Sequence, residues 1–194
     1  MNILEKLTFR PENTTDHRKV EELTRKAFWN LYGPGCDEHF MVHQLRTSPG
    51  YIPELTFVAC DGDRILGHIL YTRAYVINGG GQKHEVVSFG PVSVLPEYQK
   101  MGIGSALIKQ TMAMAKNQGH VGIFIYGDPK YYHRFGFKNA KCFNVSTADG
   151  ENFEEFMGLE LREGGLAGIK GRLHLDAAFK VDKAALEAFD STFS

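Results

Sequence analysis

Cysteine is scarce in this chain, and its three cysteines lie far apart, at Cys36, Cys60 and Cys142. Such spacing fits neither a disulfide framework nor a zinc site, because both need cysteines in pairs. We therefore expect reduced thiols and a cytoplasmic location. No apolar run approaches the roughly 20 residues of a membrane-spanning helix, and the N-terminal segment carries charges where a secretory signal has an apolar core. The sequence accordingly predicts no membrane partner.

An excess of charge is also missing. The chain has 22 lysines and arginines against 23 aspartates and glutamates, which gives a formal net charge of -1. A general nucleic-acid binder needs a basic surface, so we expect no nucleic-acid partner. The length of 194 residues and the 43% of hydrophobic residues favour one domain with a sizeable core. Because no linker or repeat interrupts the chain, we expect a single domain over 1–194, with 138–194 as a C-terminal extension packed on its core.

Helical and strand-like patterns alternate along the chain, which predicts a mixed α/β domain. Asp61-Gly62 between two apolar runs is a strong hairpin signal. Pro91 would remove a hydrogen bond from a sheet, so we expect a bulge or a splayed edge at Gly90-Pro91. Helices are expected over 12–31 (capped by Thr15 or Asp16), 36–46, 101–119, 128–135, 151–161 and 182–193, and strands over 3–9, 54–60, 65–77, 86–95, 121–127, 136–145 and 166–175.

Two glycines stand where the helix over 101–119 begins, in the stretch "QKMGIGSAL". Glycine disfavours a helix interior by about 1 kcal/mol relative to alanine. A bound ligand would offset this cost, because the first turn of a helix has unpaired N–H groups and a partial positive charge, which together attract phosphate. The alternative is a connection that merely turns a strand into a helix. The dinucleotide fingerprint and the P-loop are both excluded, because each fails at Leu107.

The pattern that fits is Q-x-x-G-x-G, formed by Gln99, Gly102 and Gly104. Together with "VSVLPEYQ" before it and "YYHRFGF" after the next strand, it resembles the GNAT family of acetyl-CoA-dependent N-acetyltransferases. The tail is similar to the YhbS-like branch of that family. The resemblance implies an α/β fold, in which helices flank a mixed, mostly antiparallel central sheet that is splayed at its fourth strand.

The resemblance also implies a site for acetyl-CoA, the acyl donor and co-substrate. The backbone of five consecutive residues would hold the pyrophosphate, and Lys100 would meet the 3′-phosphate or remain a solvated side chain. Two valines would pair their main chain with the pantetheine arm, and an N–H near the first would polarise the thioester carbonyl. The cofactor-binding residues are then Val92, Val94, Gln99, Lys100, Met101, Gly102, Ile103, Gly104 and Ser105.

Tyr132 corresponds to the family tyrosine that protonates the departing thiolate, with Tyr131 as the fallback. A phenol with a pKa near 10 can donate a proton to a thiolate with a pKa near 8.5. Some family members have a glutamate as base where this chain has Ser88, so His84, Glu85 or an ordered water chain stays open for that role.

The expected reaction is direct acetyl transfer from acetyl-CoA to a primary amine of a small molecule or peptide. The alternative is a catalytically weak CoA-sensing or partner-binding module with the same fold. The aromatic side chains from Phe28 to His39 would line the acceptor pocket by family analogy, or else form core. The histidines show no metal-ligand spacing, so we expect no metal, and a homodimer stays open.

Overall fold

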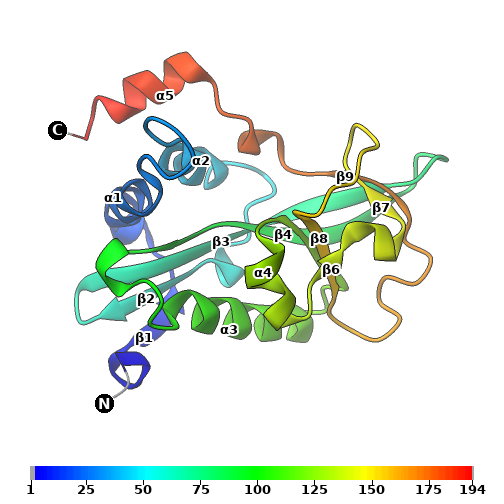
Figure 1. The fold of residues 1–194 in the computed structure, drawn as a ribbon, viewed down its shortest axis with the longest axis horizontal. Coiled ribbons are helices and arrows are strands. Elements are labelled where there is room, and N and C mark those ends of the chain that lie inside the picture. Colours follow the sequence, from blue (N-terminus) through cyan, green and yellow to red (C-terminus); the bar gives the residue numbers. More distant parts are fainter. Residues whose placement is uncertain (1–2, 194) are drawn as a thin grey trace. The chain divides into compact units, whose positions relative to one another are not determined.

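The computed structural model describes residues 3–193 and divides into two compact units, each built from segments far apart in the sequence (Figure 1). Unit 1 contains the described residues up to Leu70, Pro91–Thr111 and those from Ala177 onward. Unit 2 contains Tyr71–Gly90 and Met112–Asp176. Two strands and one helix continue from one unit into the other. Within residues 3–193 the structure has no helix of the length and apolarity that crossing a membrane requires.

Unit 1 contains an antiparallel hairpin, formed by β2 and β3, with β1 paired beside β2. Gly62, with φ of +57°, makes the tight turn between β2 and β3, as the Asp-Gly signal predicted. The strands of unit 1 are β1 (Thr8–Pro11), β2 (Phe57–Asp61), the first part of β3 (Arg64–Ile77) and the end of β4 (Lys83–Val94).

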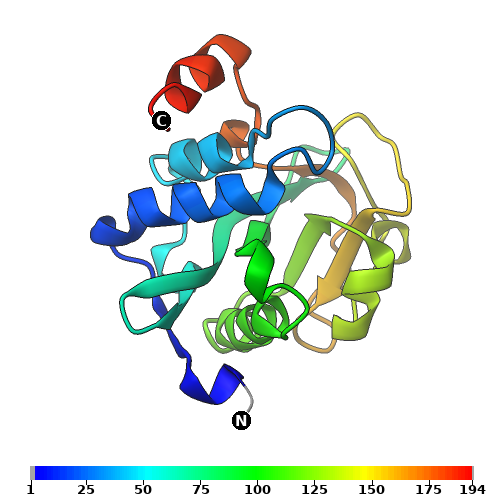
Figure 2. The same ribbon diagram turned by 60° about the vertical axis from the view of Figure 1, so that its left-hand side comes forward.

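Four helices belong wholly or partly to unit 1. Figure 2 shows α2 between α1 and α5. α3 begins against β3 at Gly67, where an added Cβ would lie 2.9 Å from Cγ2 of Ile103, so only glycine allows this close approach. The helices are α1 (His17–Phe28), α2 (Glu38–Leu45), the first part of α3 (Ile103–Asn117) and α5 (Lys183–Asp190), with shorter 3-10 turns at Ile3–Lys6, Thr14–Asp16, Pro53–Leu55, Pro96–Tyr98 and Ala177–Phe179.

Unit 2 is built around a central buried strand, β5, with the buried pattern that its apolar sequence predicted. β5 runs parallel to β4 at Val87 and Ile123, and antiparallel to β8. Phe124 of β5 and Phe156 of β8 lie in one buried cluster. The elements of this unit are β5 (Gly122–Tyr126), α4 (Pro129–Tyr132), β6 (Lys138–Asn139), β7 (Val145–Ser146), β8 (Phe156–Glu160) and β9 (Gly171–His174), with 3-10 turns at His133–Phe135 and Ala140–Phe143.

Backbone pairing gives the hydrogen-bonded strand order β1-β2-β3-β4-β5-β8-β6, with β9 joined to β3 and β7. The pairs β4–β5 and β7–β9 are parallel, and the β1–β2, β2–β3, β3–β9, β5–β8 and β6–β8 pairs are antiparallel. The prediction of a mixed, mostly antiparallel sheet flanked by helices is thus confirmed. Gly90 has φ of +147° just before Pro91, so the extended backbone of β4 is irregular where the sequence predicted a bulge or a splayed edge.

Three local predictions were wrong, and the predicted cap of α1 was right in position only. The strand predicted over 3–9 begins only at Thr8, and the strand predicted over 136–145 is split into β6 and β7 by a 3-10 turn that ends at Asn144 with φ of +57°. The segment 151–161 holds strand β8 instead of a helix, because pairing along β5 outweighs its helical composition. Asp16 holds the predicted N-cap position of α1, but its side chain makes no cap hydrogen bond there and accepts from Asn13 N–H instead. The side chain of Asn13, which accepts from Thr15 N–H, caps the preceding 3-10 turn Thr14–Asp16.

Candidate functional site

The loop that enters α3 is tied back to the strand before it. The N–H of Leu95 donates to the carbonyl of Leu66 at 3.0 Å. Nε2 of Gln99 donates to the carbonyl of Val94 at 3.2 Å. The motif glutamine therefore closes the connection between the end of β4 and the start of α3, and its contact is with the protein backbone.

The two glycines of the motif differ in what they do to the backbone. Gly102 has φ of +88° and the preceding Lys100 has φ of +61°, so the loop turns through the left-handed region twice just before the helix. The N–H of Ala106 donates to the carbonyl of Gly102 at 2.9 Å, which is the first bond of α3. The backbone N–H groups of Ile103 and Gly104 thus belong to the first turn of the helix. There the N–H groups have no carbonyl of the helix to donate to, and the helix end carries a partial positive charge. This geometry suits an anion.

The nine residues predicted to bind the cofactor all lie in unit 1, on one continuous stretch. Val92 and Val94 are half-buried and alternate with the buried Ser93, whose hydroxyl shares a hydrogen bond of 2.9 Å with that of Thr24 in α1. The other seven follow in the loop and the first turn of α3. They are Gln99, Lys100, Met101, Gly102, Ile103, Gly104 and Ser105.

Tyr132, the predicted acid, lies in unit 2 at the end of α4. The carboxylate of Asp128 caps this helix by accepting from Lys130 N–H at 2.9 Å. The Tyr132 ring is half-buried among aromatic neighbours, with its centroid 6.0 Å from that of Phe89 and 5.7 Å from that of Phe137. Its position is therefore fixed by packing.

Gly127 is a residue of this region that the sequence analysis missed. It follows β5 directly, and a Cβ added to it would overlap Cε2 of Tyr132 and lie 2.6 Å from Cδ2. The ring of Tyr132 thus lies on the bare α-carbon of Gly127. A glycine placed right after a buried apolar strand was the available signal, because it indicates that another group approaches the backbone closely.

The two side chains that stay open as the base, His84 and Glu85, lie on β4 in unit 2 together with Ser88. Ser88, at the position of the family glutamate, is 3% exposed and has no carboxylate. Glu85 is about half exposed and lies 3.8 Å from Arg73, so it has a cationic partner. The carboxylate of Glu85 therefore forms an exposed ion pair with Arg73.

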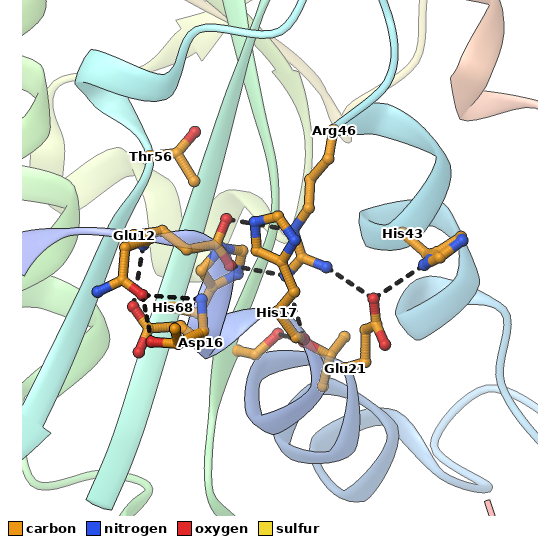
Figure 3. Close-up of polar contacts among 12 residues, drawn as sticks. Glu12, Asp16, His17, Glu21, His43, Arg46, Thr56 and His68 are labelled. Carbon is orange, nitrogen blue, oxygen red and sulfur yellow. Dashed lines mark hydrogen bonds and ion pairs between the residues drawn. The ribbon is translucent and has the colours of Figure 1, made fainter. Parts of the chain in front are cut away.

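A buried network of charges in unit 1 was also missed (Figure 3). Arg46 donates to both carboxylate oxygens of Glu12, at 2.6 and 3.2 Å, and to Oε1 of Glu21 at 2.7 Å. These three side chains are between 1% and 6% exposed. Nδ1 of His43 lies 2.9 Å from Oε1 of Glu21. The network joins the segment after β1 to α1 and α2, so its evident role is to hold these elements together.

The charges within this network are set by burial and by Arg46. Burial works to raise the pKa of Glu12, but His68 and Arg46 outweigh it and hold that pKa below its ordinary value. Burial lowers the pKa of His68 to about 4, although Glu12 opposes the shift. His68 is therefore neutral near pH 7, and Arg46 is the cation that neutralises Glu12 there.

The aromatic region after α1 divides into core and pocket. His39 is fully buried, with ring centroids 5.6 Å from Phe189 and 5.1 Å from Phe193. Phe28 and Tyr32 instead line a pocket of about 380 Å³ in unit 1. His39 thus belongs to the core, while Phe28 and Tyr32 line a pocket, and the acceptor role of that pocket stays a prediction.

Comparison with known proteins places these features in a family. The model of the acetyltransferase (GNAT) family matches residues 21–137. The N-acetyltransferase YjhQ of Escherichia coli strain K12 is 30% identical over 131 residues, which cover 68% of this chain and 69% of YjhQ.

Solved structures agree in fold. A GNAT family acetyltransferase from Brucella melitensis in complex with acetyl-CoA is 28% identical, with a TM-score of 0.71 over 90% of this chain and 98% of that one. The GNAT family N-acetyltransferase YhbS from Escherichia coli, in complex with CoA, is 22% identical and shares the fold, with a TM-score of 0.78 over 90% of this chain and 92% of that one. The chain therefore belongs to the GNAT family of acetyltransferases, as its glycine motif and its tail predicted.

Proposed function

We propose that this chain transfers the acetyl group of acetyl-CoA directly to a primary amine. The observation that carries the proposal is the start of α3, where Gly102 at φ of +88° turns the chain and the first-turn amides of Ile103 and Gly104 follow. Two solved structures with the same fold hold CoA and acetyl-CoA, which supports the choice of ligand.

The loop of unit 1 supplies the binding groups in this proposal. The backbone from Met101 to Ser105 holds the pyrophosphate, and the exposed Lys100 meets the 3′-phosphate. The main chain at Val92 and Val94 pairs with the pantetheine arm. An N–H near Val92 polarises the thioester carbonyl and stabilises the oxyanion that forms during attack.

Tyr132 acts as the general acid. The amine nitrogen attacks the thioester carbonyl carbon, the carbon–sulfur bond breaks, and the thiolate takes the proton of the Tyr132 hydroxyl. The new ammonium loses its extra proton to solvent, and the phenolate is reprotonated. Direct transfer is favoured over a cysteine intermediate, since none of the three cysteines lies in the stretch from Val92 to Ser105 that would hold the acyl donor.

One observation favours the second candidate, a catalytically weak CoA-sensing or partner-binding module. The position of the family glutamate is held by the buried Ser88, which cannot act as a carboxylate base. Thioester turnover with a panel of primary amines separates the two functions.

We also propose a cytoplasmic location, because the cysteines Cys36, Cys60 and Cys142 are all free thiols.

Calorimetry with acetyl-CoA tests the proposed site. Gly104→Val places a branched side chain beside the pyrophosphate and should weaken binding at least tenfold, which corresponds to about 1.4 kcal/mol. Gly79→Val is the matched control, because a Cβ at Gly79 meets nothing within 4 Å. An unchanged affinity in a Gly104→Val protein that still unfolds cooperatively would overturn the assignment.

A further inference from the structure

A pocket of about 380 Å³ opens in unit 1 between the connection from α1 to α2 and helix α5. Its volume lies in the range of small-molecule sites. One wall comes from the chain right after α1, and the other comes from the C-terminal helix. The lining residues are Phe28, Tyr32, Gly33, Pro34, Gly35, Cys36, Asp37, Glu38, Leu186, Glu187 and Asp190.

The lining of this pocket is acidic. It has four carboxylates and no lysine or arginine, although the whole chain has a net charge of only -1. Asp190 is neutralised by Arg25, whose Nε lies 2.7 Å from Oδ1. Within residues 3–193, no lysine, arginine or histidine forms an ion pair with the other three carboxylates, which belong to Asp37, Glu38 and Glu187. Three negative charges therefore face this pocket without a protein cation to balance them.

The pKa of Glu38, which lines the pocket, also reflects the excess of negative charge there. Burial, together with the neighbouring charge of Asp37, raises the pKa of Glu38. A carboxylate that has lost part of its water and lies beside a like charge gains most from an added cation.

An aromatic wall accompanies the carboxylates. Tyr32 is 83% exposed, which is unusual for a large side chain, and its ring centroid lies 6.4 Å from that of Phe28 at an interplanar angle of 40°. The face of a tyrosine ring attracts ammonium groups, and this attraction adds to that of nearby carboxylates. Trp29 is excluded from this role, because the guanidinium of Arg25 lies 3.8 Å from its ring centroid.

Both walls are held in place by internal contacts. The N–H of Asn30 donates to the carbonyl of Gly35 at 2.9 Å, and the N–H of Gly35 donates to Oδ1 of Asn30 at 2.8 Å. On the other side, Phe189 of α5 packs on α2, with its ring centroid 4.5 Å from that of His43. Contacts within the chain thus fix both walls of the pocket.

A fully buried histidine backs the wall and points at it. Nε2 of His39 lies 3.2 Å from Oδ1 of Asp190 and is without a hydrogen bond of good geometry in the described part of the chain. Its Nδ1 lies 3.4 Å from the sulfur of Cys36. Burial lowers the pKa of His39, so the imidazole adds no positive charge at neutral pH. A polar group is thus aimed at the pocket wall and left unsatisfied there.

We propose that this pocket binds an aliphatic di- or polyamine as the acceptor of the acetyl group, holding ammonium groups with Asp37, Glu38, Glu187 and the face of Tyr32. The inference rests on the proposed function and narrows its acceptor class. Amines that carry a carboxylate, such as free amino acids, are repelled by the same charges. Although the net charge of the whole chain is only -1, the lining of this pocket is acidic, and the lining is what a bound amine meets.

Calorimetry on the purified full chain without acetyl-CoA tests the pocket, with spermidine as the probe. We expect the double variant Glu38→Gln/Glu187→Gln to bind spermidine at least tenfold more weakly than the natural chain. The matched control is Glu5→Gln/Glu54→Gln, which removes the same charge from two exposed sites of unit 1 and should leave the affinity unchanged. Tyr32→Ala, at an exposed position, should also weaken binding.

Three results would overturn the proposal. The first is that the natural chain does not bind spermidine. The second is that the pocket variant and the control variant bind spermidine equally well. The third is that the natural chain binds 6-aminohexanoate, which keeps an amine and adds a carboxylate, as tightly as spermidine. Acetyl-CoA affinity is measured on the same proteins. If acetyl-CoA fails to bind the natural chain, the proposed function fails, whereas loss of spermidine binding alone refutes only the acceptor class.

Discussion

The ring of Tyr132 lies on the α-carbon of Gly127, so closely that a Cβ there would be 2.6 Å from Cδ2 of the ring. Real Cβ atoms do not approach another heavy atom to this distance, so the two residues depend on each other. Any side chain at position 127 must push the ring aside. If Tyr132 is the acid, Gly127 is a positioning residue, because it acts only through the place of that ring.

Removing the hydroxyl of Tyr132 tests its role directly. Tyr132→Phe keeps the ring and its packing on Phe89 and Phe137. We expect kcat to fall by roughly 10²–10⁴, the usual range for a positioned acid, while acetyl-CoA affinity stays nearly unchanged. Tyr131→Phe is the control and should be far milder. Full activity of both variants would show that the proton reaches the thiolate by another route.

Displacing the ring should mimic the loss of its hydroxyl. We expect Gly127→Ala to lower kcat while acetyl-CoA affinity is retained, because the methyl overlaps the Tyr132 ring and moves it. The double variant Gly127→Ala/Tyr132→Phe should be no slower than Tyr132→Phe alone, since both changes act through one group. A merely structural glycine would give additive losses instead. Gly79→Ala, with open space around its Cβ, is the control for the substitution itself.

Features with a local cause could be predicted from the sequence. The hairpin at Gly62 and the start of α3 at Gly102 both rest on backbone angles that glycine adopts more readily than other residues, and both glycines have positive φ in the structure. The short helix α4 begins at Pro129, whose fixed φ suits a first turn. Each of these signals is complete within a few residues.

Features that depend on distant partners could not be predicted. The strand β8 pairs with β5, so Phe156 lies opposite Tyr126 although thirty positions of sequence separate them. Arg46, which follows α2, meets Glu12 after β1 and Glu21 of α1, and none of these three residues belongs to a motif. The pocket beside Tyr32 needs helix α5 as its second wall. In each case the partner is supplied by tertiary structure.

The buried network around Arg46 should matter more for stability than an exposed pair of equal length. Arg46→Met leaves the nearly buried carboxylates of Glu12 and Glu21 without their cation, and we expect a loss of about 3–5 kcal/mol in the free energy of unfolding. Arg64→Met breaks an ion pair with Glu97 of the same 2.6 Å length but 54% exposed, and should cost about 0–1 kcal/mol.

Urea unfolding at pH 7 measures both values. Equal losses for Arg46→Met and Arg64→Met would contradict the argument, since burial is the feature that distinguishes the two ion pairs. The triple variant that also makes Glu12→Gln and Glu21→Gln should recover part of the lost stability, because it removes the stranded charges.

Acid should weaken the cap that precedes α1. The hydrogen bonds from Arg10, at 2.6 and 2.9 Å, are the main cause that holds the pKa of Asp16 below its ordinary value of 3.8, and burial only partly opposes them. A carboxylate whose pKa is lower in the folded than in the unfolded chain stabilises the fold at pH values above its ordinary pKa. This stabilisation is lost as the pH falls through the pKa that the group has in the folded chain. Asp16→Asn should therefore cost about 1–3 kcal/mol at pH 7, and the difference from the natural chain should shrink below pH 3.8. A difference in urea midpoint that is independent of pH would contradict this.

The C-terminal segment should be inseparable from the rest of the chain, and two truncations test this. Ending the chain after Asn139 removes β8, which pairs along the whole of β5 and contributes Phe156 to the buried cluster of unit 2, so we expect an insoluble or molten product. Ending it after Asp176 removes α5, which has no buried residue, and should leave a folded protein that has lost one wall of the acidic pocket. Circular dichroism and thermal unfolding distinguish the products. Cooperative unfolding with intact acetyl-CoA binding in the shorter chain would show that 138–194 is a detachable extension, contrary to our proposal of one domain over 1–194.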